Sequence, residues 1–512
     1  MRRSPPPASP VFWLVTLLIA GCAAGPIDYP RNYSNVITDT ADTGLGREVA
    51  EWLEIHPGLS GFYPLISGND ALGARLALID AAERSIDAQY FLMKTDLAGV
   101  LFAGRLLQAA DRGVRVRFLL DDVFTSVDDR ALVLLDQHPN VEVRLFNPIG
   151  RGGFYYLNYA ADFKRANRRM HNKSFTVDNQ ISIVGGRNIA DEYFELKAGA
   201  EFRDFDMVAI GPVAGEIGKT FDRFWNHSLA VPMEAFATDR DDSDLDTTRA
   251  EMAEKLGAEA KSAYSRAVGS PLIQDLVDNR IELFPATFEV ITDEPDKLVN
   301  PLSSEHRTLV TRMAEVATQA ESEVLVITPY FIPGVTGVGF WRSLIDKGVR
   351  VIIFTNSLAS NNHIPVHAAY ARYRHDIIQA GVELYEIRVD ATDIPTDKDD
   401  PRFDSVTLHT KAVMIDRQLL FVGSLNLDPR SIDINSEMGV LVESPEMAAQ
   451  LAEPFFESLP ERAYRLEEDE QGRLRWHGLI DGREVIENKE PQAGKWRRFK
   501  AFLSRILPES QL

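Results

Sequence analysis

The sequence predicts an α/β protein made of two similar units in tandem, and two repeated patterns support this prediction. A strand–helix–strand pattern covers residues 86–120 and recurs at 326–354, with β-branched runs flanking an apolar-periodic segment that ends at a glycine. The motif His-x-Lys-x4-Asp follows each copy. The tyrosine of the first strand precedes the histidine of the motif by 81 residues in one copy and by 79 in the other. This matched order and spacing indicates a duplication.

The duplication divides the chain into two units and a connecting segment. The first unit is placed at 61–236 and the second at 301–470, each with a mixed or largely parallel sheet covered by helices. Residues 237–300 are expected to form a linker that contains helices. The linker opens with the acidic stretch 239–244, which is typical of a solvated segment, and continues with a helix over 250–268.

The N-terminus has the features of an export signal. Arg2 and Arg3 precede an apolar run at 11–20 that is too short to span a bilayer. The run ends in Leu-Ile-Ala-Gly-Cys, which resembles the signal peptide of bacterial lipoproteins, cleaved just before the cysteine. A plain signal peptide that happens to contain a cysteine is the alternative. Cys22 is the only cysteine in the sequence, so it has no disulfide partner within the chain, and lipidation would account for it.

The sequence therefore predicts a signal peptide at 1–21, a lipidated Cys22 and an N-terminal linker at 22–60. Such a protein would be anchored to a membrane surface of the cell envelope and face the periplasm of a Gram-negative bacterium. Ala23 follows the cysteine, where an aspartate would favour the inner membrane, so the outer membrane is the expected location.

Composition narrows the class of ligand. With 45% hydrophobic and 26% charged residues the chain is typical of a globular protein. Its 55 basic and 76 acidic residues give a net charge of −21. Proteins that bind nucleic acids usually carry the opposite sign over at least one domain. No nucleic-acid partner is expected, although a local basic cleft is compatible with this balance. The oligomeric state is not predicted.

The repeated motif suits phosphate chemistry. On a strand, residues two apart share a face, so His171 and Lys173 should project together, as should His409 and Lys411. Lysine brings positive charge to phosphoryl oxygens, and a neutral imidazole can attack phosphorus or transfer a proton. These four side chains are the predicted catalytic centre.

Each motif ends in an aspartate, Asp178 in the first unit and Asp416 in the second. Both belong to the predicted catalytic motif by position. They should fall on the face opposite the histidine and lysine, at the strand end. We therefore expect them to pair with a loop or helix and to support the motif structurally.

A glycine turn follows each motif and leads to an asparagine, Asn188 or Asn426, seventeen residues after the histidine. An asparagine amide can donate to a phosphate oxygen, and Ser424 is assigned with these two residues to phosphate binding or orientation.

A carboxylate comes later in each unit: Asp204, with Asp206 as a rival, in the first and Glu437 in the second. A carboxylate that accepts the Nδ1 proton of a histidine fixes the tautomer and stabilises the cationic ring. We predict this orienting role for Asp204 and Glu437.

These residues carry a resemblance to a known family. The sequence resembles the phospholipase D superfamily, whose hallmark is the paired motif. Residues 167–175, 184–189 and 355–360 are similar to the bacterial cardiolipin synthase C branch. The resemblance covers about residues 61–507. A lipoprotein signal is not a general feature of cardiolipin synthases, which bears on the cellular role more than on the chemistry.

The resemblance implies two α/β/α sandwich halves related by a pseudo-twofold axis, with both motifs in one cleft. It also implies a phosphohistidine intermediate, with His171 as the nucleophile and His409 as the acid and base, and no cofactor or metal. The leading function is phosphatidyl transfer that builds cardiolipin from phosphatidylglycerol and a second phospholipid. Hydrolysis to phosphatidic acid, a phospholipase D-type nuclease and a non-catalytic lipoprotein are the alternatives.

Two histidines outside the motifs have a spacing that metal ligands can share. His363 and His367 are four residues apart, but Pro365 lies between them and no glutamate follows His363, so a zinc-protease site is not expected. His367 and Tyr370 are predicted either to line a pocket or to pack a helix.

The C-terminal segment 471–512 contains a basic amphipathic helix. Trp496, Phe499, Leu503 and Ile506 recur at helical spacing among five basic residues. This composition suits a helix on an anionic lipid surface, and a helix docked on the body of the protein is the alternative.

Overall fold

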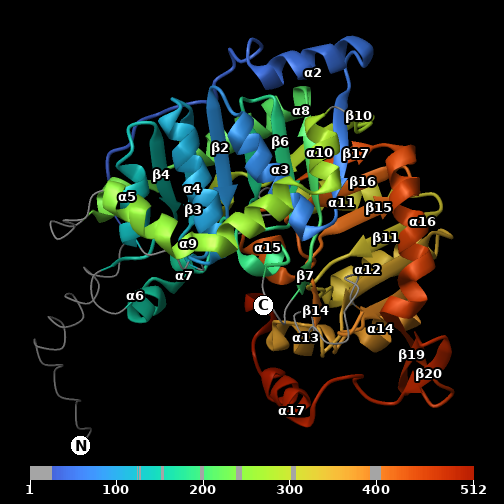
Figure 1. The fold of residues 1–512 in the computed structure, drawn as a ribbon. Helices are drawn as coiled ribbons and strands as arrows, with labels where there is room; N and C mark the ends of the chain where they lie inside the picture. Colours follow the sequence, from blue (N-terminus) through green and yellow to red (C-terminus); the bar gives the residue numbers. More distant parts are fainter. Residues whose placement is uncertain are drawn as a thin grey trace, which may run out of the picture.

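The structure is a computed structural model, and Figure 1 shows two α/β halves that meet along one edge. The predicted signal peptide, Cys22 and the acidic stretch 239–244 lie outside the described residues. The described residues are 26–123, 125, 129–151, 155–196, 201–237, 245–278, 280–300, 307–391 and 405–512.

The first half is built on a mixed sheet. Its strands are β1 (Ser60–Leu65), β2 (Ser85–Tyr90), β3 (Arg115–Asp121), β4 (Val141–Phe146), β5 (Ser174–Val177), β6 (Ile181–Gly185), β8 (Asp206–Ile210) and β9 (Ala230–Pro232). Pairing gives the spatial order β9-β4-β3-β2-β5-β6-β8-β1. Among these eight strands, β2, β3 and β4 are the ones that run parallel to one another, because crossover helices connect them.

The second half repeats this arrangement. Its strands are β10 (Phe284–Thr292), β11 (Glu323–Ile327), β12 (Arg350–Asn356), β13 (Glu383–Ile387), β15 (Ala412–Ile415), β16 (Leu419–Gly423), β17 (Met438–Glu443), β18 (Ala463–Glu468), β19 (Leu474–Ile480) and β20 (Arg483–Glu487). They follow the order β10-β17-β16-β15-β11-β12-β13-β18-β19-β20, with β11, β12 and β13 parallel. The predicted α/β fold of two similar halves is confirmed.

The two sheets join through equivalent edge strands. β1 pairs antiparallel with β10, with Ser60 opposite Ala286, and the result is one sheet of 18 strands. β1 and β10 hold the same position in their halves, so this contact relates the halves by an approximate twofold axis. A second contact between the halves is the parallel pair of β7 (Glu201–Arg203) and β14 (Val406–Leu408).

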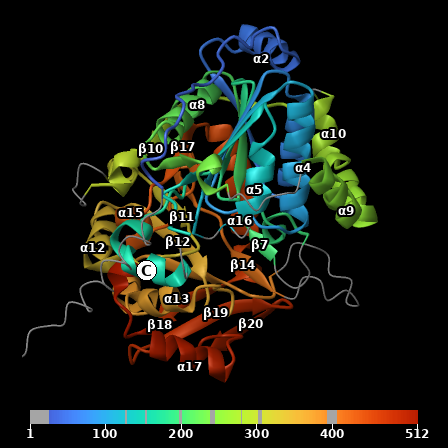
Figure 2. The ribbon, with the colours of Figure 1, turned by 90° about the vertical axis from the view of Figure 1, so that its left-hand side faces the viewer.

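Helices cover both faces of the sheet (Figures 1 and 2). In the first half they are α2 (Gly44–Ile55), α3 (Gly68–Ala81), α4 (Leu97–Asp111), α5 (Asp129–Asp136), α6 (Tyr155–Ala161), α7 (Phe163–Ala166), α8 (Pro212–Trp225), α9 (Leu245–Val268) and α10 (Pro271–Val277). In the second half they are α11 (Thr308–Ala317), α12 (Gly334–Ile345), α13 (Ile364–Tyr370), α14 (Arg374–Gln379), α15 (Pro429–Asp433), α16 (Pro445–Arg462) and α17 (Lys495–Ser504). No helix in this described part of the chain is both long and apolar enough to cross a membrane.

Matching glycines end the equivalent crossover helices. Gly113 follows α4 with φ +96°, and Gly348 follows α12 with φ +93°. Residues with a Cβ rarely adopt this left-handed conformation, which turns the chain from the helix into the next parallel strand. The glycine at this point of each repeated pattern therefore has a structural reason.

Two predicted boundaries are corrected by the structure. β10 falls inside the predicted linker 237–300, yet it pairs with β1 and β17 and so begins the second half. The linker helices α9 and α10 are also integrated: at Gly73 in α3 an added Cβ would come within 2.2 Å of the carbonyl oxygen of Ala267 in α9. β19 and β20 fall inside the predicted tail 471–512, yet they extend the second sheet. Pairing partners far away in sequence decide these boundaries.

A buried polar network holds this C-terminal extension. Arg374 pairs with Glu386 and with Glu490, each at 2.6 Å. Glu386 also accepts hydrogen bonds from the Tyr370 hydroxyl (2.9 Å) and the Trp476 indole (3.0 Å). The Arg374 side chain is 3% exposed, so its charge depends on these partners.

We expect Arg374→Ala to lower the free energy of unfolding by about 3–5 kcal/mol, because it leaves Glu386 buried without its counter-charge. Urea unfolding followed by tryptophan fluorescence measures the loss. Arg350→Ala is the matched control, since Arg350 bridges two glutamates at 2.6 and 2.8 Å but is 43% exposed. That variant should lose no more than about 1 kcal/mol. Equal losses in the two variants would contradict the prediction.

Candidate active site

Each His-x-Lys segment lies just before a strand rather than inside it, since β5 and β15 begin only after the lysines. Each segment instead contacts the other half. The His171 backbone N–H donates to the carbonyl of Ser436 (3.0 Å), and the His409 N–H donates to the carbonyl of Arg203 (2.6 Å). These exchanges bring the two motifs into one site at the junction of the halves.

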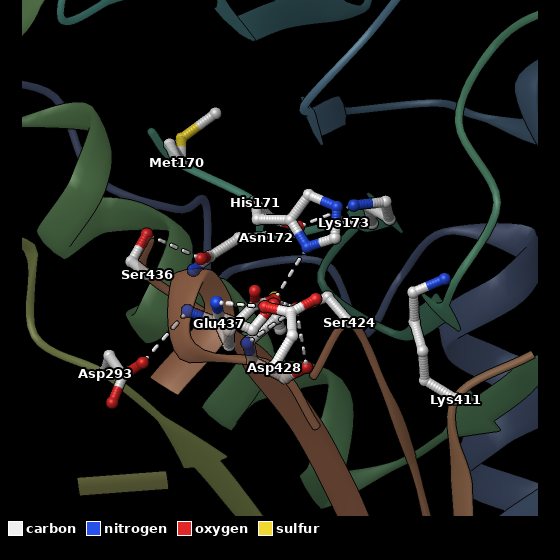
Figure 3. Close-up of polar contacts among 12 residues, drawn as sticks. Met170, His171, Asn172, Lys173, Asp293, Lys411, Ser424, Asp428, Ser436 and Glu437 are labelled. Carbon is white, nitrogen blue, oxygen red and sulfur yellow. Dashed lines mark hydrogen bonds and ion pairs between the residues drawn. The ribbon is translucent and has the colours of Figure 1, made fainter. Parts of the chain in front are cut away.

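Each catalytic histidine also contacts the orienting carboxylate of the opposite half. His171 Nδ1 lies 2.8 Å from a carboxylate oxygen of Glu437, and His409 Nδ1 lies 2.5 Å from Asp204. Figure 3 shows the first pair, with Ser424 beside the carboxylate. The sequence singled out both carboxylates but not their exchange, because their positions along the chain do not reveal which histidine each one meets. All four side chains are buried.

Asp206, the rival carboxylate, serves the fold. It pairs with Arg75 at 2.8 Å, and both side chains are buried. It also lies 3.5 Å from the guanidinium of Arg187. Asp206 is the first residue of β8, whereas Asp204 lies in the two-residue connection between β7 and β8, so the two carboxylates have different partners.

The two carboxylates are supported differently. Ser424 donates a hydrogen bond to Glu437, so its hydroxyl orients that carboxylate. The equivalent position in the first half is Gly186, where a Cβ would lie 2.1 Å from the carboxylate of Asp204. A serine there would displace Asp204. The first half thus pairs the shorter Asp204 with a glycine, and the second half pairs the longer Glu437 with a serine. The two half-sites differ in this detail.

Both histidines are neutral in the free site. Burial lowers the pKa of His171 to about 4, although Glu437 opposes this shift. Burial and the charge of Lys411 lower the pKa of His409 to about 3. With Nδ1 donating to a carboxylate, the lone pair of a neutral ring is at Nε2, the atom that can attack phosphorus or accept a proton.

The carboxylates stay ionised. Burial raises the pKa of Glu437, but His171 and Lys173 outweigh burial and bring it below its usual value. Burial acts on Asp204 in the same direction, and Lys411 and His409 lower its pKa below the usual value. Both carboxylates are thus anionic in a buried site, beside two lysines.

The lysines are poised to receive an anion. Lys173 Nζ donates to the carbonyl of its own His171 (2.7 Å), and Lys411 Nζ lies 2.9 and 3.3 Å from the ring nitrogens of His409. Burial lowers the pKa of Lys173 to about 7 and that of Lys411 to about 8.

We therefore expect inorganic phosphate to bind with proton uptake near pH 8. At this pH most Lys173 and about half of Lys411 are neutral, and a bound dianion would raise both pKa values and charge both side chains. Titration calorimetry in buffers of different ionisation enthalpy measures the protons taken up. Lys173→Arg should remove most of this uptake, because arginine is already charged. A binding enthalpy independent of buffer would contradict the prediction.

Amide groups near the histidines have buried atoms without partners among the described residues. They are Oδ1 of Asn188, Oδ1 of Asn426 and Nδ2 of Asn172. The other end of the Asn188 amide contacts the Tyr193 hydroxyl at 3.0 Å. Because a hydroxyl can donate as well as accept, this amide can turn its NH2 group to a phosphoryl oxygen. A buried polar atom without a hydrogen-bond partner costs free energy, and a bound ligand that hydrogen-bonds to it would remove this cost.

Aromatic walls around the histidines were not predicted from the sequence. Phe202 stacks on His409, with ring centroids 5.6 Å apart and an angle of 15° between planes, and Tyr193 meets the same ring edge-on at 5.1 Å. Phe91 meets the His171 ring edge-on at 4.8 Å. A Tyr-Phe pair recurs at the end of the first strand of each unit, and this repeat could have predicted Phe91 as a site residue.

The two motif aspartates lie away from this centre. Asp178 accepts hydrogen bonds from the backbone N–H groups of 83–85, at 2.7–3.0 Å. Asp416 does the same for the N–H groups of 321–323, at 2.7–2.9 Å. Each carboxylate fixes the loop that begins the first parallel strand of its half. Their assignment to the catalytic motif is thus corrected to a structural role, as strand alternation indicated.

The other histidine pair belongs to the fold. His367 is buried and contacts Arg374 (3.0 Å), and its ring packs against Tyr370 with centroids 5.5 Å apart. The packing alternative thus describes it. Within the described ranges, no group of three or more His, Cys, Asp and Glu side chains is arranged to hold a metal ion.

Fold and paired half-sites define a protein of the phospholipase D type, and comparison with known proteins agrees. The family model described as "Cardiolipin synthase, PLD-like domain" matches residues 76–225 and 313–459. The chain belongs to this family. The match spans both His-x-Lys motifs and both orienting carboxylates.

Similar proteins include cardiolipin synthase C of Escherichia coli K12, 38% identical over 463 residues, covering 88% of this chain and 96% of the relative. An uncharacterized protein of Helicobacter pylori 26695 is 32% identical, covering 98% of this chain and 99% of the relative. Among solved structures, phosphatidylserine synthase of Haemophilus influenzae shares the fold, with a TM-score of 0.53 at 15% identity, covering 82% of this chain and 92% of that structure.

Proposed function

We propose that this protein is a phosphatidyltransferase that forms cardiolipin through a phosphohistidine intermediate. The observation that carries the proposal is the pair of neutral, buried histidines, each with Nδ1 bound to a carboxylate of the other half and a lysine beside it. The similarity to cardiolipin synthase C over most of both chains supports the choice of substrate class.

In the first step, Nε2 of His171 attacks the phosphorus of a donor phospholipid and the bond to the leaving alcohol breaks. His409 donates a proton to the departing oxygen. Burial and Lys411 set its pKa of about 3, and an anionic phosphodiester beside the ring raises that pKa and supplies the charge needed to hold the proton. Glu437 stabilises the positive charge that develops on His171.

In the second step, the hydroxyl of an incoming phospholipid loses its proton to His409 and its oxygen attacks phosphorus. The phosphorus–nitrogen bond breaks and His171 is regenerated. Lys173 and Lys411 balance the charge on the phosphoryl oxygens throughout. Two easier displacements thus replace one difficult displacement.

An apolar cavity beside the site supports lipid substrates over nucleic acid. It has a volume of about 920 Å³ and lies between the halves, within the roughly 300–1,000 Å³ typical of ligand pockets. Phe202 and Asp204 line it, and both also contact His409. Much of the remaining wall is apolar, with Phe354 and Phe455 among the side chains. Such a wall suits acyl chains.

The test supplies purified protein with labelled phosphatidylglycerol and phosphatidylethanolamine. Cardiolipin as the product supports the proposal. Phosphatidic acid alone would show a hydrolase that uses water as the acceptor and would overturn it, and cleavage of DNA in place of lipid would show a nuclease. Trapping during turnover followed by mass spectrometry locates the intermediate. Phosphate on the His409 peptide alone would reverse the assigned histidine roles.

We also propose that the mature chain begins at a lipidated Cys22 and is tethered on the periplasmic side of the outer membrane. The lipoprotein-type signal and the single cysteine support this location. Mass spectrometry of the N-terminal peptide from cell envelopes tests it. A diacylglyceryl group on Cys22 is expected, and an uncleaved or unmodified N-terminus would refute the tether.

A further inference from the structure

Helix α17 turns its apolar side chains to solvent. Trp496 is 65% exposed and Phe502 64%, and Phe499 and Leu503 are about half exposed. Ile506, in the turn that follows the helix, is 87% exposed. No residue of this helix is buried. An ordinary surface helix places its apolar face against the core, so α17 has the reverse orientation.

Polar contacts nevertheless fix the helix to the body of the protein. The guanidinium of Arg497 donates to the backbone carbonyls of Leu358 and Asn361. Arg498 donates to the carbonyl of Glu490 at 2.6 Å. The basic face therefore holds the helix in place, and the outward direction of the apolar side chains is set by these contacts.

The attachment points of α17 lie next to the catalytic segments. Arg497 binds the loop that follows β12, and Asn356 at the end of β12 makes two hydrogen bonds to the backbone of Leu408, beside His409. After α17 the chain returns to the site, where Gln511 accepts from Asn167, four residues before His171, at 2.9 Å. Figures 1 and 2 show α17 at the end of the molecule opposite α2.

The charge around the apolar face fits an anionic lipid surface. Residues 495–507 contain five basic side chains and no acidic one, in a chain of net charge −21. Lys500 lies over the ring of Trp496 at 5.6 Å. A helix with exposed aromatic residues beside lysine and arginine binds at the headgroup level of a bilayer, where apolar burial and attraction to anionic headgroups add together.

We propose that α17 is an interfacial helix that lies on an anionic phospholipid bilayer and holds the catalytic cleft against it. This inference goes beyond the transferase function and is independent of the Cys22 tether. A tether alone leaves the cleft free to face any direction, whereas α17 is fixed relative to both half-sites and would set their orientation at the membrane.

The direct test uses the full chain in vesicles of phosphatidylglycerol and phosphatidylethanolamine with brominated acyl chains, which quench tryptophans at bilayer depth. Wild-type fluorescence should be quenched, and Trp496→Phe should remove most of the quenched component. Trp52→Phe, in α2 at the opposite end, is the control and should change nothing. Equal quenching in the wild type and in Trp496→Phe would overturn the proposal.

A second test separates membrane contact from catalysis. Trp496→Glu, Phe502→Glu and Ile506→Glu together should lower turnover of vesicle phospholipid at least about tenfold. Turnover of a short-chain, monomeric phosphatidylglycerol should be unchanged, which also shows that the variant is folded. The control replaces exposed apolar residues elsewhere, Ile55 (75% exposed), Val335 (84%) and Ile486 (56%), with glutamate.

Other results would assign the face differently. If the α17 variant breaks a dimer in sedimentation velocity and leaves vesicle turnover unchanged, a second copy of the chain covers the face and the membrane proposal is wrong. A wild-type protein inactive on both substrates would refute the transferase function, while the quenching experiment would still decide the role of α17.

Discussion

His171→Ala and His409→Ala are each expected to lower phosphatidyl transfer by about 10^4-fold or more. One variant lacks the nucleophile and the other lacks the acid and base, and the double variant should be little worse than either, because the two rings act in one pathway. The initial rate of labelled cardiolipin formation measures the loss.

A matched control separates chemistry from folding. His227 also sits beside a carboxylate, Asp296 at 3.2 Å, but far in sequence from both motifs. His227→Ala should keep activity within about twofold, because the Asp296 partner is 64% exposed and an ion pair with an exposed member is worth at most about 1 kcal/mol. A double-histidine variant that retains transfer would remove the whole mechanism.

Glu437→Gln and Asp204→Asn should each lower the rate by about 10^2- to 10^4-fold with little change in substrate binding. An amide in place of the carboxylate can neither fix the Nδ1–H tautomer nor stabilise the positive charge on the ring. Measuring kcat and KM separately distinguishes this effect from a loss of binding.

Because each carboxylate contacts the histidine of the opposite half, each carboxylate variant should behave like the variant of the histidine that it contacts. A donor lipid with a nitrophenyl leaving group needs no proton from an acid. His409→Ala and Asp204→Asn should regain most of the first-step rate on that donor, while His171→Ala and Glu437→Gln should not. If Glu437→Gln is instead rescued together with His409→Ala, the carboxylates do not act on the histidines that they contact.

The sequence alone determined the fold class, the duplication and most residues of the site. The duplicated strand–helix–strand pattern, the paired motifs and the ordered glycine turns, asparagines and carboxylates predicted the α/β fold of two halves, and the structure confirms it. Strand alternation also separated the motif aspartates from the histidines, because side-chain direction along an extended segment is a local property. Membership of the family follows from the same motifs.

Only the tertiary structure decided which partner each side chain meets. The pairing of Glu437 with His171, the pairing of β10 with β1, and the addition of β19 and β20 to the second sheet all join residues that are distant in sequence or in separate halves. The amphipathic pattern of α17 left two orientations open, and the contacts of Arg497 selected the one with apolar residues outward. Local sequence sets the direction of a side chain within its own element, but its partners depend on how complete elements pack.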